Sequence, residues 1–181
     1  ITLPEFDPKG PELDYIIVGS HELKTMNSVY RAVMERVSNG ARLIVLDQAD
    51  KWAEQMDGLY AFQSVQYWGN MKWGNQGRLF AGKSPFLDGL PSARALGWEY
   101  QNFYENQVWG LHMGWRGTEV IVGLAAQHRK EILNALVRVP FARGQVFLST
   151  LDILGELKSE RPQSAVGKKL FMNLLEVEPG K

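Results

Sequence analysis

Cysteine is absent from the 181 residues of this sequence, which excludes disulfides, thiolate metal ligands and a cysteine nucleophile. Histidine is scarce: His21, His112 and His128 lie far apart, and none of the spacings typical of a metal site joins them. A Gly-rich phosphate loop is missing as well. We therefore expect no metal site and no cofactor.

The sequence has no excess of charge of one sign, because 20 Lys and Arg residues balance 20 Asp and Glu residues. Binding to nucleic acid or to an anionic membrane surface usually requires a basic excess or a Lys/Arg-rich block, so we expect neither partner. No apolar run approaches the ~20 residues that span a bilayer, and a basic-then-apolar signal pattern is missing from the N-terminus. These absences predict a soluble domain.

The length favours one domain, since 181 residues suffice for one well-buried core and are few for two. Residues 1–12 are rich in proline and acidic residues, which is typical of a linker from an upstream domain. The chain also begins at Ile1 and not at Met. We expect a single domain over residues 13–181, cut from a longer polypeptide.

Two apolar runs, residues 13–19 and 41–47, have the continuous hydrophobicity of parallel strands that are covered on both faces. Between them, apolar residues recur at helical spacing over 26–38, and Asn39-Gly40 is suited to end that helix. A strand, a helix and a strand in this order predict a right-handed βαβ unit with parallel pairing. A second helix is expected after Asp47 or Asp50, and a weak strand over 62–68.

Residues 69–115 are aromatic and lack a clear period, and the segment 79–91 should hold only one helical turn. Beyond them we expect a strand over 118–125, a helical turn over 129–133, and strands over 135–140 and 145–150. A tight turn at Arg143-Gly144 joins the last two strands and makes them antiparallel, so the sheet should be mixed. A helix over 163–177, with one apolar stripe, should cover the sheet.

The carboxyl ends of strands line the ligand crevice of an α/β sheet, which makes the polar residues there the first candidates for chemistry. Ser149, Thr150 and Asp152 follow the last strand, and Ser20 and His21 follow the first. Ser20-His21-Glu22 contains the residue types of a nucleophile, a base and an orienting acid. Neighbouring residues of an extended segment point to opposite sides, however, so Ser20 and His21 would not meet without a special turn.

Several motifs resemble a known family: the strand Gly144-Gln-Val-Phe-Leu-Ser-Thr-Leu-Asp152, the polar loop 156–161, the helix that begins after Pro162, and Ser84-Pro-Phe-Leu-Asp-Gly-Leu-Pro91 followed by Trp98. They are similar to the C-terminal flavodoxin-like domain, related to class I glutamine amidotransferases, of many bacterial glycoside hydrolases. The β-galactosidase-type enzymes of glycoside hydrolase family 2 carry such a domain, and the trimerisation domain of other β-galactosidases is related. The resemblance covers most of residues 13–177.

This resemblance implies an α/β fold of three layers, flavodoxin-like and glutamine-amidotransferase-like, with a mostly parallel, partly mixed sheet. It also implies a non-catalytic accessory domain, because the amidotransferase ancestor uses a Cys nucleophile with a His and a Glu, and only Asp152 could stand in for any of these. The partners would be sibling domains of the parent glycoside hydrolase, with a homo-oligomer as a further possibility. A periplasmic or secreted location would follow.

Two other interpretations compete with the accessory domain. A small hydrolase or amidase could use Ser or carboxylate residues at the strand ends, and a glycosidase pair could form from Glu99 with Glu105 or from Glu119 with Asp152. A carbohydrate-binding module could instead use exposed indole rings, which stack on sugars. The same rings could equally be architectural or contact a sibling domain. The candidates for sugar or interface contacts are Trp68, Trp73, Trp98, Trp109 and Trp115.

Overall fold

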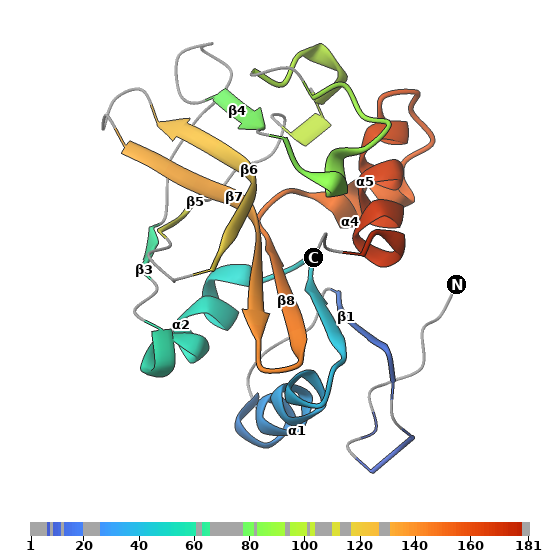
Figure 1. Ribbon diagram of the computed structural model, residues 1–181. Helices are drawn as coiled ribbons and strands as arrows, with labels where there is room; N and C mark the ends of the chain where they lie inside the picture. The colour runs from blue at the N-terminus through green and yellow to red at the C-terminus, as the bar shows by residue number, and fades with distance from the viewer. Residues whose placement is uncertain are drawn as a thin grey trace.

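The computed structural model in Figure 1 shows a mixed α/β domain built on one eight-stranded sheet. The structure describes residues 7, 9–11, 13–19, 26–60, 63–65, 78–81, 83–92, 95–100, 102–103, 110–112, 117–126 and 131–178. The main path through the sheet runs in the order β1-β2-β8-β7-β5-β3, and β6 and β4 extend it from β7. No helix in the described part is long and apolar enough to cross a bilayer.

Three neighbouring strands form the parallel part of the sheet: β1 (Tyr15–Val18), β2 (Arg42–Val45) and β8 (Gly144–Ser149). Helix α1 (Met26–Ser38) connects the first two, which confirms the predicted βαβ unit. Their central residues are apolar in succession because both faces of these strands are covered. In the register, Ile17 lies opposite Ile44, and Ile44 lies opposite Phe147.

The remaining strands pair antiparallel around β7 (Glu131–Phe141), which has 11 residues. β7 has three partners: β8 and β5 (Gly110–His112) pair with one of its edges, and β6 (Glu119–Ala126) pairs with it as well. Outermost are β4 (Arg78–Ala81) on β6 and β3 (Gln63–Val65) on β5. Two of the seven strand pairings described are parallel and five are antiparallel, so the expectation of a mostly parallel sheet was wrong although the sheet is mixed.

Four local predictions differ from the structure. Residues 79–81 were expected to lie in a segment with only one helical turn, but they belong to β4, because they pair with β6. The turn between β7 and β8 is Ala142-Arg143, with Ala142 in the left-handed region at φ 50°, and Gly144 already belongs to β8. Residues 131–133 are strand and not a helical turn, because they pair with β6. The segment 156–161 was expected to be a loop, but its first half continues helix α4 (Ile153–Lys158), which Asp152 caps.

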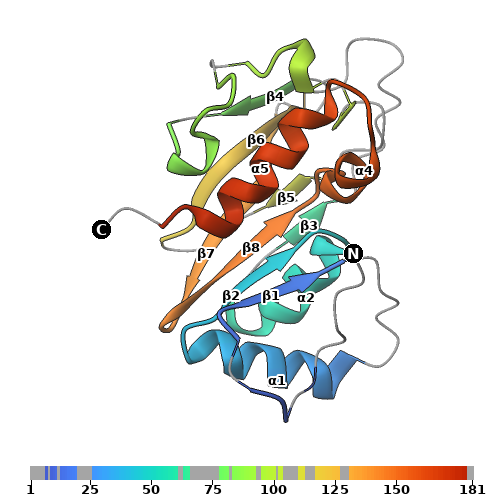
Figure 2. The same cartoon turned by 90° about the vertical axis from the view of Figure 1, so that its right-hand side faces the viewer.

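Helices cover both faces of the sheet, as Figure 2 shows. Alternate strand residues point to opposite faces. Leu43 and Val45 therefore pack with α1 and α2 (Ala49–Tyr60), whereas Ile44 and Phe147 pack with α4 and α5 (Ser164–Glu176). The predicted helix over 163–177 is thus confirmed as α5, and its apolar stripe is buried through Leu170 and Leu174.

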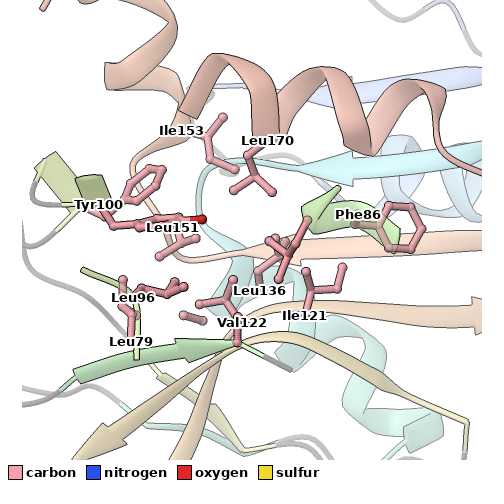
Figure 3. Packing of buried hydrophobic residues seen from close by; sticks show 14 of the residues in the cluster. Leu79, Phe86, Leu96, Tyr100, Ile121, Val122, Leu136, Leu151, Ile153 and Leu170 are labelled. Carbon is pink, nitrogen blue, oxygen red and sulfur yellow. The ribbon is translucent and has the colours of Figure 1, made fainter. Parts of the chain in front are cut away.

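The cluster on the α5 face also contains residues from the aromatic middle of the chain (Figure 3). The 3-10 turns η2 (Pro85–Leu87) and η3 (Trp98–Tyr100) contribute Phe86 and Tyr100, which are almost completely buried. The Phe86 ring packs edge-on against Phe147, with 5.0 Å between centroids. Short turns carry these aromatic residues, which explains why no period was visible in the sequence.

Candidate functional site

The parallel strands β1, β2 and β8 end on the same edge of the sheet, and the predicted crevice residue Ser149 is the last residue of β8. Its side chain is buried, with 1% exposed. Its hydroxyl accepts a hydrogen bond from the Leu151 amide at 3.2 Å and lies 3.5 Å from the Leu151 carbonyl. These contacts shape the turn after β8. A nucleophile needs a base within hydrogen-bond reach, and Ser149 is placed as a turn-forming residue instead.

Thr150 and Asp152 join the same edge to neighbouring elements. The amide and the hydroxyl of Thr150 both donate to the Ala135 carbonyl, at 2.8 and 3.1 Å. The Asp152 carboxylate accepts from the Gly155 amide at 2.9 Å and so caps the first turn of α4. The structure therefore brings three predicted residues together, in contacts that end β8 and begin α4. Ser20 and His21 lie outside the described residues.

A buried carboxylate that the sequence interpretation missed lies next to this edge. Glu156 on α4 is 6% exposed, and its Oε2 accepts a hydrogen bond from Asn102 Nδ2 at 3.1 Å. Its aliphatic stem packs on Gly167 of α5, where an added Cβ would lie 2.3 Å from Glu156 Cβ. The spacing of three residues from the buried Ile153 could have revealed that Glu156 faces inward, because such residues share one helix face.

Tyr100 is a buried titratable residue whose pKa is clearly shifted. Its ring is 1% exposed, and its hydroxyl has no hydrogen-bond partner among the residues that the structure describes. Burial disfavours the phenolate, and the neighbouring Glu99 carboxylate adds to this effect, so the pKa of Tyr100 is raised from 10.0 to about 12. Tyr100 therefore acts as a neutral core residue and is unsuited to proton transfer near pH 7.

Replacing Tyr100 with phenylalanine should reduce the fall in the free energy of unfolding at alkaline pH. Above pH 10 the phenol of the unfolded chain loses its proton, whereas the folded protein keeps it up to about pH 12. The unfolded state gains from this difference, so the free energy of unfolding falls as pH rises between these values, by about 2 kcal/mol. Urea unfolding of both proteins from about pH 8 to about pH 12 measures the effect.

Tyr100→Phe should be as stable as the parent protein, or slightly more stable, at neutral pH, because it removes a buried hydroxyl that no described residue hydrogen-bonds. Its stability relative to the parent protein should then rise above pH 10. Parallel pH curves for the two proteins would contradict the assignment.

Among the predicted tryptophan contacts, the structure describes Trp98, and Trp68, Trp73, Trp109 and Trp115 lie outside the described residues. Trp98 is 71% exposed at the start of η3, which makes it a candidate contact residue. By contrast, Trp52 of α2 is 2% exposed and packs against Tyr30, with 5.4 Å between ring centroids. The structure therefore contains one indole in the core and one at the surface among the residues it describes.

Of the two carboxylate pairs considered for a glycosidase, the structure describes both members of one, Glu119 with Asp152. Glu105 lies outside the described residues. Glu119 accepts a hydrogen bond from Ser84 Oγ at 2.6 Å and forms an ion pair with Arg138 at 3.3 Å, which joins η2 to the sheet. Asp152 caps α4. Within the described ranges, no three His, Asp or Glu side chains gather in a way that could hold a metal ion.

No protein-family model matches the sequence. No curated protein matches it either. Several solved structures are similar in fold. One is the exo-β-1,4-mannosidase Op5Man5 from Opitutaceae bacterium strain TAV5, with 15% identity and a TM-score of 0.54 over 90% of this chain and 26% of the mannosidase. Another is the β-galactosidase from Rahnella sp. R3, with 10% identity and a TM-score of 0.51 over 92% of this chain and 22% of that enzyme.

A third similar structure is the cytoplasmic protein STM3548 from Salmonella typhimurium, with 12% identity and a TM-score of 0.49 over 94% of this chain and 77% of that protein. That score is too low to support an inference. At such identities the first two likenesses show the fold alone. The chain spans about a quarter of the length of these two glycoside hydrolases.

Proposed function

We propose that this chain is an accessory domain of a larger glycoside hydrolase and performs no catalysis of its own. The observation that supports this most is the fold similarity of nearly the whole chain to about a quarter of a mannosidase and of a β-galactosidase. A domain of that relative size has sibling domains as its first partners. On this proposal the fold is a three-layer, flavodoxin-like variant of the glutamine amidotransferase type.

The chemistry at the strand ends supports the same proposal. The amidotransferase nucleophile is a cysteine, which this sequence lacks. Ser149, Thr150 and Asp152 make the hydrogen bonds that end β8 and begin α4. Side chains engaged in this way contribute to the fold, whereas a catalytic acid or nucleophile has to be available to the substrate.

An activity assay tests the absence of catalysis. We expect the chain to show no turnover of chromogenic β-mannosides, chromogenic β-galactosides or glutamine above the buffer rate. Two variants of Asp152 provide the control. Asn retains a capping side chain and removes the charge, so Asp152→Asn should leave stability nearly unchanged, whereas Asp152→Ala should cost about 1 kcal/mol through loss of the cap on α4. Turnover that disappears in Asp152→Asn or in His21→Ala would overturn the proposal.

The association with a larger enzyme requires a separate experiment. An antibody raised against this chain should detect, in extracts of the source cells, a polypeptide far larger than 20.5 kDa, and the immunoprecipitate should hydrolyse a β-mannoside or a β-galactoside. A single band at the mass of the isolated chain, with no glycosidase activity in the precipitate, would contradict the proposed role.

A further inference from the structure

The junction between the end of α1 and the start of β2 contains Asn39-Gly40, the only Asn-Gly pair in the sequence. Both residues are exposed, and an added Cβ at Gly40 would meet no atom of the described residues within 4 Å. A glycine after asparagine leaves its own peptide nitrogen unshielded, because it carries no side chain. Such a nitrogen can attack the side-chain amide of the preceding asparagine, so this pair is a candidate for chemical modification.

In the folded chain the Gly40 nitrogen is held by the end of the helix. The Gly40 amide donates to the Val37 carbonyl at 3.0 Å. The Ala41 amide donates to the Arg36 carbonyl at 3.1 Å, which completes the Schellman arrangement that ends many helices at a glycine. A hydrogen-bonded amide gives up its proton only when the turn opens, as in hydrogen exchange. The nitrogen is therefore unreactive while α1 keeps this end.

The turn of the β7–β8 hairpin holds the asparagine side chain. Arg143 Nη2 donates to Asn39 Oδ1 at 2.9 Å, although the two residues are 104 positions apart in the chain. The Arg143 amide also donates to the Ser38 carbonyl at 3.4 Å, and Figure 2 shows the hairpin turn beside this end of α1. The side-chain amide of Asn39 is free to rotate toward the Gly40 nitrogen only after the bond to Arg143 has broken.

The backbone around the junction is packed too closely to absorb a change in its length. An added Cβ at Gly144 would lie 2.2 Å from the Val37 carbonyl oxygen and 2.3 Å from that of Ala41. The Gln145 amide also donates to the Ala41 carbonyl, at 3.4 Å. A backbone that runs through the side chain of residue 39 gains one methylene. The turn would then lose the two bonds that end α1 and its contact with β8.

We propose that Asn39 is a modification site that loses its side-chain amide when the β7–β8 turn separates from α1, and that Arg143 holds the reaction back. In the opened turn the Gly40 nitrogen passes its proton to solvent and bonds to Asn39 Cγ. The Cγ–Nδ2 bond breaks, and Nδ2 takes up a proton and leaves as ammonia. Water then opens the cyclic imide at one carbonyl to give aspartate, or at the other to give isoaspartate. This modification takes place whether or not the chain is part of a larger enzyme.

A comparison of the folded protein with the guanidinium-unfolded chain tests the site. Both samples are incubated at one pH and temperature, and chromatography with mass spectrometry separates the asparagine, aspartate and isoaspartate forms of the peptide that contains residue 39. We expect Asn39 to react in the unfolded chain, and at least about tenfold more slowly in the folded protein, because only its open fraction reacts. Amide hydrogen exchange at Gly40 gives that open fraction independently.

Matched variants test the role of the guanidinium. Arg143→Ala should raise the rate in the folded protein about threefold, because an exposed charged contact stabilises the closed turn by little more than this. Hydrogen exchange at Gly40 should rise by the same factor, and the rate in the unfolded chain should stay unchanged. Arg31→Ala removes another exposed arginine, from the middle of α1, and should change neither rate. Similar melting temperatures of the two variants would show that both fold.

Three outcomes would overturn the proposal. One is an Asn39 that reacts no faster in the unfolded chain than the other asparagines, which would remove the site. Another is an equal rate in the folded and the unfolded protein, since the turn would then give no protection. The third is a rate in folded Arg143→Ala that equals or falls below that of the parent protein. In that case the guanidinium either has no effect or assists the attack by polarising the Asn39 carbonyl.

Discussion

Replacing Arg42 with leucine should lower the free energy of unfolding by about 3 kcal/mol, because it removes charged hydrogen bonds from a buried site. Arg42 is 4% exposed, and its Nη1 donates to the carbonyls of Leu174 and Leu175 at 2.7 and 2.8 Å. These carbonyls belong to the last turn of α5, where no further helical amide is available to them. The positive charge also complements the negative end of the helix dipole.

Two aromatic rings strengthen this arrangement, since the Arg42 guanidinium lies 5.5 Å from the Tyr15 ring centroid and 5.7 Å from that of Phe147. Arg42→Lys should recover part of the loss, because an ammonium keeps the charge and loses the planar stacking. Glu178→Gln is the matched control: its ion pair with Arg42 is exposed to solvent on the Glu178 side, so stability should hardly change. Urea unfolding measures all three. A leucine variant as stable as the parent protein would refute the assignment.

Substituting alanine for Gly144 should be similarly costly, at about 3 kcal/mol or a loss of roughly 6–12 °C in melting temperature. An added Cβ would lie 2.2 Å from the Val37 carbonyl oxygen and 2.3 Å from that of Ala41. Both are backbone atoms, so neither can rotate away. The start of β8 would have to move away from the end of α1 and from the residue that precedes β2.

Gly40→Ala provides the comparison for this prediction. Gly40 has a φ of 122°, and an added Cβ there meets no atom within 4 Å. Its substitution should cost only the strain of an unfavourable backbone conformation, of the order of 1 kcal/mol. Thermal unfolding of the two variants under identical conditions gives the difference directly. If the melting temperature of Gly144→Ala is no lower than that of Gly40→Ala, the close approach of the backbones at Gly144 does not determine the cost of the substitution.

The elements with strong local periodicity could be predicted from the sequence. The βαβ unit, the β7–β8 hairpin and α5 were all visible, because continuous apolar runs and a single apolar stripe each indicate one kind of burial. The proportion of antiparallel pairing was not visible. It depends on β6 and β7 extending along each other and on the short strands β4, β5 and β3, whose pairing partners lie far away in the chain.

The candidate site could be predicted only in outline. The position of Ser149, Thr150 and Asp152 at a strand end followed from the pattern, but their hydrogen bonds to Leu151, Ala135 and Gly155 depend on how the chain turns after β8. Arg42 reads in the sequence as a polar residue at a strand edge. Its burial follows from α5, which is formed more than a hundred residues later.

The exposed indole was a candidate because of its residue type, yet the sequence could not separate it from the other four tryptophans. Trp98 faces solvent because it begins a 3-10 turn whose third residue, Tyr100, is buried. With about three residues per turn in such a helix, Trp98 and Tyr100 point in different directions. To predict that Trp98 is exposed, one would therefore have to know which residue of the turn packs in the core.

The position of β8 between β2 and β7 has a consequence for how the protein is made. β2 gains its second neighbour only when β8 exists, and Arg42 pairs with Gln145. A ribosome adds about 5–20 residues per second, so β1, α1 and β2 wait roughly 5–20 s for that partner. During this interval the apolar edge of β2 is open to other chains. We expect the β7–β8 hairpin to form quickly, because its strands are adjacent in the sequence. The pairing of β8 with β2 should be the slow step of folding, because these paired strands lie farthest apart in the sequence.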